Sequence, residues 1–83
     1  MFNIIGAYIN KLSKEDIKKF ALSKGATLSN EEIDFTYEFI KKNWKDVLKN
    51  PAIFDIERYG KYYQKDNFVK VKQVFNEYKR YLK

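Results

Sequence analysis

Apolar residues recur every three or four positions along most of this chain, which is the spacing of residues on one face of an α-helix. The stretch Val69–Lys72 alternates as a strand would, but a lone strand would have no partner, so a helix is predicted there too. The pattern predicts five helical segments, namely Phe2–Leu12, Lys14–Lys24, Asn30–Lys49, Ile56–Tyr63 and Asn67–Leu82. We therefore expect an all-α fold, a compact bundle of four to five helices in a single domain covering residues 1–83.

Capping residues mark several ends of the predicted helices. Ser13 precedes the second helix, and its hydroxyl can accept a backbone N–H of the first turn. Ser29 and Glu32 have the spacing of a capping box at the start of the third helix. Gly25 follows the second helix in the manner of a C-terminal glycine. Asp55 is placed to cap the short fourth helix, and the polar residues 64–66 separate that helix from the last one.

The third helix is predicted to lie at the centre of the bundle. Ile33, Ile40 and Trp44 follow the helical period on one face, so they are the predicted core. In the second helix, the residues expected to face inward are Ile17, Phe20 and Ala21. The apolar stripes of the first and last helices are Phe2, Ile5, Ile9 and Leu12, and Phe68, Val71, Phe75, Tyr78 and Leu82.

Phe35 and Phe39 lie on a different side of the third helix, and two interpretations apply to them. Either they pack on another helix of the same chain, or they form an exposed apolar patch that binds a partner. Aromatic residues are 18% of the chain, more than so small a core requires. We favour a small non-enzymatic interaction or regulatory module that binds a protein partner or a second copy of itself. The residues predicted to bind the partner are Phe35, Phe39, Tyr59, Tyr62 and Tyr63.

The net charge of +6 supports an alternative, a non-specific nucleic-acid-binding protein. The codon usage of an AT-rich genome would produce the same abundance of lysine without any partner. The segment Arg58–Lys65 mixes basic and aromatic residues, as surfaces for single-stranded nucleic acid do. Lysines before and after this segment would form one phosphate-binding face if they met in space. The residues of this alternative are Lys41, Lys42, Lys45, Lys49, Arg58, Lys61 and Lys65.

Specific recognition of DNA bases is disfavoured, although the second and third helices have the spacing of a helix-turn-helix. The first turn of the third helix, which would approach the phosphates, carries the carboxylates of Glu31, Glu32 and Asp34. These charges would be repelled by DNA. The same carboxylates and Glu38 form an acidic group, but no His, Cys or glycine-rich loop accompanies them to complete a catalytic or metal site. Carboxylates in the first turn of a helix are ordinary capping residues.

Catalytic and metal chemistry are disfavoured because the chain has no Cys and no His. Thiolate nucleophiles, disulfides and zinc sites built on sulfur or imidazole are excluded, and the usual acid–base group near neutral pH is missing. We expect no cofactor, no metal and no small-molecule substrate. The apolar opening segment is too short for a signal peptide or a membrane span, so a cytoplasmic protein is expected.

Two stretches resemble a family of short uncharacterised helical proteins from Bacillus-type bacteria. The first is Ile9–Ala21, followed by Gly25 and by Leu28-Ser29, where an Asn-Lys-Leu-Ser opening leads into an acidic-capped helix and then a second capped helix. The second is Ile53–Arg58, which is similar to an Ile-Phe-Asp step of that family. The resemblance covers about the first two thirds of the chain. It implies a small helical bacterial protein and brings no site residues with it.

Overall fold

The structure, a computed structural model, describes the backbone of residues 2–50 and 54–81 and the side chains of residues 4–50 and 54–77. Within these ranges every regular element is a helix, which confirms the all-α fold. The elements are α1 (Phe2–Lys11), α2 (Lys14–Ser23), α3 (Asn30–Lys49), the 3₁₀-helix η2 (Ile56–Tyr62) and α4 (Lys65–Tyr81). Three residues of the predicted apolar stripes have side chains outside the described ranges, namely Phe2, Tyr78 and Leu82.

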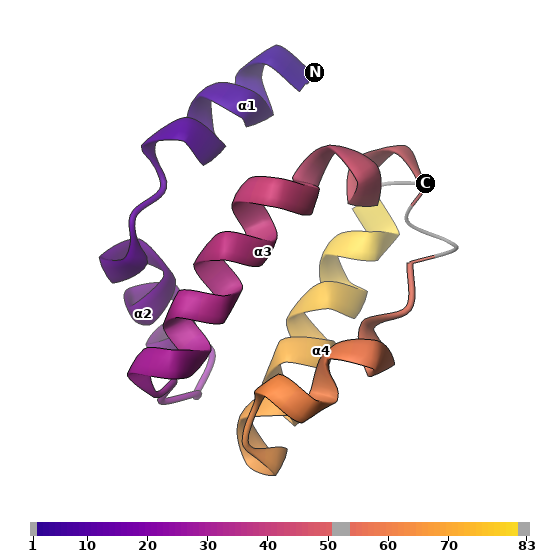
Figure 1. Cartoon of the computed structure of the whole chain (residues 1–83). Helices are drawn as coiled ribbons and strands as arrows, with labels where there is room; N and C mark the ends of the chain where they lie inside the picture. The colour runs from indigo at the N-terminus through magenta and orange to yellow at the C-terminus, as the bar shows by residue number, and fades with distance from the viewer. Residues whose placement is uncertain (1, 51–53, 82–83) are drawn as a thin grey trace.

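Helix α3 runs through the middle of the molecule, as the sequence predicts (Figure 1). Helices α1 and α2 lie along one side of α3, whereas α4 and η2 lie along the other. The most deeply buried apolar residues are Ile17 of α2, Ala26 of the α2–α3 loop and Ile33 of α3. Ile40 and Trp44 are half-buried. The core is therefore small and lies between α2 and the first turns of α3.

Both predicted serine caps form. The Ser13 hydroxyl accepts the backbone N–H of Asp16 at 3.1 Å, and the Asp16 carboxylate accepts the N–H of Ser13 at 3.0 Å. At α3, the Ser29 hydroxyl accepts the N–H of Glu32 at 3.2 Å, and the Glu32 carboxylate accepts the N–H of Ser29 at 2.7 Å. These reciprocal bonds satisfy backbone donors that a helix start leaves free.

The end of α2 is a glycine-dependent turn. Gly25 has a φ of 87°, a left-handed conformation that a residue with a Cβ rarely adopts. Its N–H donates to the Leu22 carbonyl at 3.0 Å, and the N–H of Ala26 reaches back to the Ala21 carbonyl at 2.9 Å. These two bonds form a Schellman motif. The turn directs the chain back along α2 and places Ala26 in the core.

Phe20 is wrongly predicted to face inward, since 41% of it is exposed. Ile17 is buried and Ala21 is half-buried, so the side of α2 that packs on α3 is centred on these smaller residues. Phe20 lies on the flank of that stripe, where the ammonium group of Lys24 lies over its ring at 5.7 Å. The α-helical period therefore places Phe20 at the edge of the buried face of α2 rather than at its centre.

The short fourth helix forms where predicted, but as a 3₁₀-helix. The Asp55 carboxylate accepts the N–H of Glu57 at 3.1 Å, which confirms the predicted cap. Gly60 lies against the ring of Phe68, where a Cβ atom would come within 2.9 Å of the ring. The absence of a side chain at this position therefore lets η2 approach α4 closely.

Helix α4 begins at Lys65, two residues before the predicted start. Lys65 and Asp66 are exposed, so they show no apolar period although they are helical. Asp66 in the first turn suits the positive end of the helix dipole. The polar residues 64–66 are predicted to separate the last two helices, but Lys65 and Asp66 belong to the solvent-facing first turn of α4.

Candidate functional site

Aromatic residues from α3, η2 and α4 meet in one cluster. Phe35 stacks on Tyr62 with ring centroids 4.2 Å apart and meets Tyr63 edge to face at 5.7 Å. Phe39 contacts Tyr59 edge to face at 4.8 Å. The members of this aromatic cluster are Phe35, Phe39, Phe54, Tyr59, Tyr62, Tyr63, Phe68 and Phe75. The structure therefore brings together all five residues that the sequence predicts to bind a partner.

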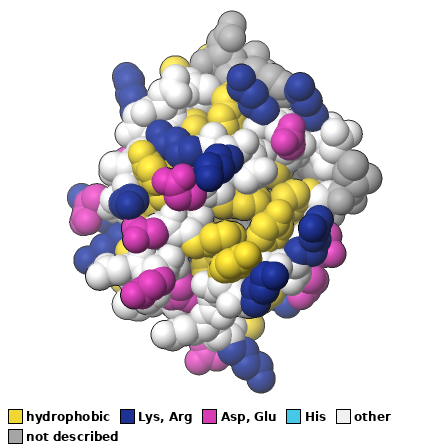
Figure 2. Space-filling view, in the orientation of Figure 1, with side chains coloured by type: hydrophobic (Ala, Val, Ile, Leu, Met, Phe, Trp, Pro, Cys, Tyr) yellow, Lys and Arg dark blue, Asp and Glu magenta, His cyan; other side chains and the backbone are white. Residues whose placement is uncertain are grey.

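The aromatic cluster reaches the surface of the protein. Phe35, Phe39, Tyr59 and Tyr63 are half-buried, whereas Tyr62 is 46% exposed. Figure 2 shows hydrophobic side chains gathered in the middle of the face where α3 lies beside α4 and η2, with charged side chains around them. Phe35 and Phe39 of α3 therefore pack against other rings of the same chain, whereas Tyr62 of η2 presents a ring to solvent.

A polar chain anchors the inner edge of the aromatic cluster. The hydroxyl groups of Tyr63 and Thr36 lie 2.6 Å apart, and Thr36 donates to the backbone carbonyl of Glu32 at 2.7 Å. Burial raises the pKa of the Tyr63 phenol, the hydrogen bond with Thr36 opposes this rise, and the negative charge of Glu32 adds to it. The Tyr63 phenol is therefore uncharged at neutral pH and is fixed in position at the inner edge of the aromatic cluster.

Glu32 is the centre of a buried polar network that the sequence does not reveal. Only 3% of this residue is exposed. Besides the N–H of Ser29, its carboxylate accepts the backbone N–H of Gln64 at 2.7 Å and the side-chain amide of Asn67 at 2.9 Å. Asn67 also donates to the carbonyl of Thr27 at 3.0 Å. One carboxylate thereby joins the start of α3 to the start of α4.

The Glu32 network predicts an acid-sensitive fold. Burial disfavours ionisation, but the N–H groups of Ser29 and Gln64 and the Asn67 amide outweigh it and hold the Glu32 pKa below its usual value. A depressed folded-state pKa contributes stability above the unfolded-state pKa of about 4.3, and this contribution is lost as pH falls through the folded-state pKa. We expect the urea midpoint to fall as pH is lowered from about 6 to about 3, and to fall less in Glu32→Gln.

The comparison with Glu32→Gln isolates this carboxylate, because the other acidic residues titrate in both proteins. Urea unfolding followed by circular dichroism at several pH values measures the effect. Equal falls of the midpoint in the two proteins would show that Glu32 does not carry this part of the acid sensitivity.

The lysines of α3 do not gather on one face with those of η2. Lys41 donates to the backbone carbonyls of Ile9 and Asn10 at the end of α1. Lys45 lies over the ring of Trp44, which faces α1. Lys42 pairs with Glu38 at 3.8 Å, and Lys49 is exposed at the end of the helix. Two of the four lysines therefore belong to the α1 side of α3, away from the aromatic cluster.

Three basic residues of the predicted nucleic-acid set lie within four residues of Tyr62 in the sequence. The ammonium group of Lys61 lies over the ring of Tyr62 at 5.4 Å. Arg58 and Lys65 are exposed, and within the described part of the chain neither forms an ion pair. Beside them, Lys72 is already paired with Glu57 at 3.2 Å. One positive charge, that of Lys61, therefore lies directly at the exposed ring of Tyr62.

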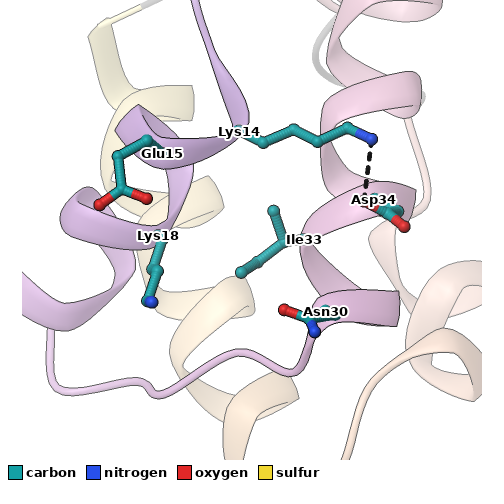
Figure 3. Close-up of a pocket in the computed structure, with 6 residues that line it drawn as sticks. All are labelled: Lys14, Glu15, Lys18, Asn30, Ile33 and Asp34. Carbon is teal, nitrogen blue, oxygen red and sulfur yellow. Dashed lines mark ion pairs between the residues drawn. The ribbon is translucent and has the colours of Figure 1, made fainter.

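An open hollow of about 360 Å³ lies between the starts of α2 and α3. It is lined by Lys14, Glu15, Lys18, Asn30, Ile33 and Asp34 (Figure 3). Lys14 and Asp34 pair across it at 3.0 Å, and the hydrogen bond to Asp34 raises the pKa of Lys14. The carboxylate of Glu15 points away from this pair. The charges of Lys14 and Asp34 thus neutralise each other across the hollow.

No group of three or more acidic side chains in the described ranges is arranged to hold a metal ion. None of the described helices is both long enough and apolar enough to cross a membrane. Comparisons with protein-family models, with curated proteins and with solved structures find no match. The resemblance to a family of Bacillus-type bacteria therefore stays a prediction, and function is inferred from the geometry of the chain itself.

Proposed function

We propose that this protein is a small non-enzymatic interaction module that binds a protein partner through the aromatic cluster around Tyr62. The observation that carries the proposal is the position of this ring, which is 46% exposed while one of its faces stacks on Phe35 at 4.2 Å. Stacking already orders this ring before binding, so burying it under a partner costs little additional side-chain entropy. Tyrosine and arginine are also enriched among residues that dominate binding energies.

The charges around Tyr62 indicate the chemistry of the partner. We propose that Arg58, Lys61 and Lys65, all within four residues of Tyr62 in the sequence, form a basic border around its ring. Lys61 lies over the ring at 5.4 Å, and none of the three forms an ion pair among the described residues. A partner that places an apolar side chain against Tyr62 and carboxylates against this border would complement both features. An amphipathic helix with acidic flanks has this arrangement of groups. Such a helix is the partner we propose.

Removing the Tyr62 ring is expected to weaken partner binding about tenfold or more, because central aromatic contacts dominate interface energies. The test immobilises the wild-type chain, Tyr62→Ala and Tyr8→Ala, captures proteins from cells of the source organism, and measures affinities with the purified partner. Tyr8→Ala is the matched control, since it removes an exposed tyrosine of α1. Equal retention by wild type and Tyr62→Ala would refute the proposed surface.

The same residues test the nucleic-acid alternative. The observation in its favour is the Lys61 ammonium group over the exposed ring of Tyr62, since surfaces for single-stranded nucleic acid combine positive charge with aromatic rings. Short single- and double-stranded oligonucleotides are titrated at two salt concentrations with the wild type and Lys61→Glu. Binding that weakens steeply with salt and is lost in Lys61→Glu would assign the surface to nucleic acid. If no oligonucleotide binds at low salt, the nucleic-acid alternative is refuted and the proposal of a protein partner remains.

A further inference from the structure

Helix α1 lies at the edge of the molecule, where one of its sides packs on α3 and the other faces solvent (Figure 1). On the inner side, Gly6 lies so close to Trp44 that a Cβ atom would be 3.3 Å from the indole ring. On the outer side, Ile4 is 79% exposed and Tyr8 is 68% exposed, the two largest exposed fractions among the large hydrophobic residues that the structure describes. Lys11 is also exposed, and it lies on the same side, because residues 4, 8 and 11 share one face of a helix.

The outer face of α1 changes from apolar to charged along the helix. Ile4 is wholly apolar, Tyr8 combines an apolar ring with a hydroxyl group, and Lys11 ends the helix with an ammonium group. The rise of an α-helix places Ile4 and Lys11 about 10 Å apart along its axis. The surface of a lipid bilayer changes in the same order over about 5–10 Å, from hydrocarbon through the interfacial layer that tyrosine prefers to the charged headgroups. A helix that enters obliquely, with Ile4 deepest, therefore matches each side chain to its layer.

The charges on and beside this face are positive. The ten residues of α1 include no acidic residue, and Lys11 forms no ion pair with any described residue. On α3, the ammonium group of Lys45 lies over the ring of Trp44, the same ring that lies against Gly6 of α1. Lys45 is exposed and likewise forms no ion pair among the described residues. A surface with negative charge therefore complements the outer face of α1.

Anionic lipid fits this face better than a nucleic acid or an acidic protein does. Phosphates of a nucleic acid would pair with Lys11 but would leave the Ile4 side chain in water. A protein would need a groove shaped to receive a projecting helix. Lipid is liquid, so it adjusts to a projecting side chain and offers apolar and anionic groups at the same surface. Ten residues are too few to cross a bilayer, so the helix lies at its surface.

We propose that the outer face of α1 binds reversibly to membrane surfaces that contain anionic lipid. Ile4 enters the boundary of the acyl chains, the Tyr8 ring lies at the interface with its hydroxyl hydrated, and Lys11 reaches a lipid phosphate through its flexible stem. Two apolar side chains and few charges make this binding weak. The surface is separate from the one proposed around Tyr62, because η2 lies on the other side of α3.

Co-sedimentation with unilamellar vesicles tests this surface. Vesicles of phosphatidylglycerol and phosphatidylcholine in equal amounts are compared with vesicles of phosphatidylcholine alone. The wild type is expected to bind the anionic vesicles much more strongly, and this binding should weaken as salt rises. Tyr8→Glu is expected to lower the partition coefficient at least about tenfold, because it brings a charge into the apolar contact. Lys11→Gln is expected to lower it about fivefold, because one lysine near the anionic surface is lost.

Gln73→Glu is the matched control for both variants, because all three substitutions lower the net charge by one. Gln73 is exposed on α4, which lies on the side of α3 away from α1. The control should bind the anionic vesicles within about twofold of the wild type, because salt screens a charge that lies more than a Debye length from the membrane. Circular dichroism verifies that the variants are helical.

Tyr62→Ala should bind the vesicles as the wild type does, so a failure of the proposed protein partner and a failure of lipid binding are distinguishable. A wild type that does not bind the anionic vesicles overturns the proposal, including the cases in which it binds only oligonucleotides or only itself. Equal binding to both kinds of vesicle would show that anionic lipid is not recognised. Equal losses in Lys11→Gln and Gln73→Glu would assign the binding to the net charge of the chain and would also overturn the proposed face.

Discussion

Replacing Glu32 by glutamine is expected to lower the free energy of unfolding by about 2–3 kcal/mol, although the two side chains have nearly the same shape. A chain of 83 residues has a total stability of about 4–12 kcal/mol. The substitution would therefore remove a large fraction of it. The expected cost is high because Glu32 is buried and because three N–H groups from other residues point at its two oxygen atoms.

The hydrogen-bond geometry explains why glutamine fails as a substitute. One carboxylate oxygen accepts the N–H of Ser29 and the amide of Asn67, and the other accepts the N–H of Gln64. A glutamine side chain has one oxygen acceptor, and its amide nitrogen is a donor. In either orientation the amide nitrogen faces an N–H donor, so at least one buried donor loses its acceptor. The stronger bonds to a charged acceptor are lost as well.

Glu31→Gln is the matched control for this prediction. Glu31 precedes Glu32 in the same first turn, has the same charge and is exposed. Its substitution removes the same favourable interaction with the helix dipole, which is worth about 0.3–1 kcal/mol at the surface. Urea unfolding of both variants at neutral pH measures the difference. If the two variants lost similar amounts of stability, the buried network would contribute no more than an ordinary first-turn charge.

The local features of the fold were predictable from the sequence because they depend on neighbouring residues alone. Ser29 and Glu32 lie three residues apart, and this spacing alone predicts their reciprocal hydrogen bonds. The bounds of α3 match the prediction for the same reason, since its cap and its long apolar period are both local. Gly25 likewise adopts the predicted turn, because a positive φ favours glycine.

The features that the sequence did not predict depend on what packs against each element. The spacing of Glu32 identifies a cap, but its second oxygen binds Gln64, which follows 32 residues later. The start of α4 was missed for a related reason, because its first turn faces solvent. Phe20 has the period of a core residue, yet it lies on the flank of the buried stripe of α2, and 41% of it is exposed. No local signal distinguishes these cases.

The candidate site was partly predictable in the same sense. Excess aromatic residues and the second apolar face of the third helix indicate a surface, and the five predicted residues do lie together. Which ring is exposed could not be predicted, because adjacent tyrosines have similar local sequence. Tyr63 is anchored through Thr36, whereas Tyr62 stacks on Phe35 and remains partly in solvent. The placement of the α3 lysines could not be predicted either. Lys41 and Lys45 lie on the side of α3 that faces α1, and α1 is far from η2 in the sequence.

Replacing Phe35 by alanine is expected to lower the free energy of unfolding by about 2–4 kcal/mol, near the lower end of the range for buried phenylalanines. Phe35 is half-buried, but it contacts four other rings and is the residue on which Tyr62 stacks. Alanine removes these contacts and leaves a cavity between α3 and η2. The remaining side chains are rings with few rotamers, so they fill such a cavity poorly.

Two further variants separate the contribution of Phe35 to stability from the contribution of the aromatic cluster to partner binding. Tyr62→Ala removes a ring that is already 46% exposed, so it should cost only about 1 kcal/mol. Phe35→Leu keeps most of the volume and should cost less than about 1.5 kcal/mol, but it removes the stacking platform. Urea unfolding measures the stabilities, and near-ultraviolet circular dichroism reports the packing of the tyrosines. Equal losses in Phe35→Ala and Tyr62→Ala would mean that the cluster has no inner and outer part, and that Tyr62 is a core residue rather than a ring available to a partner.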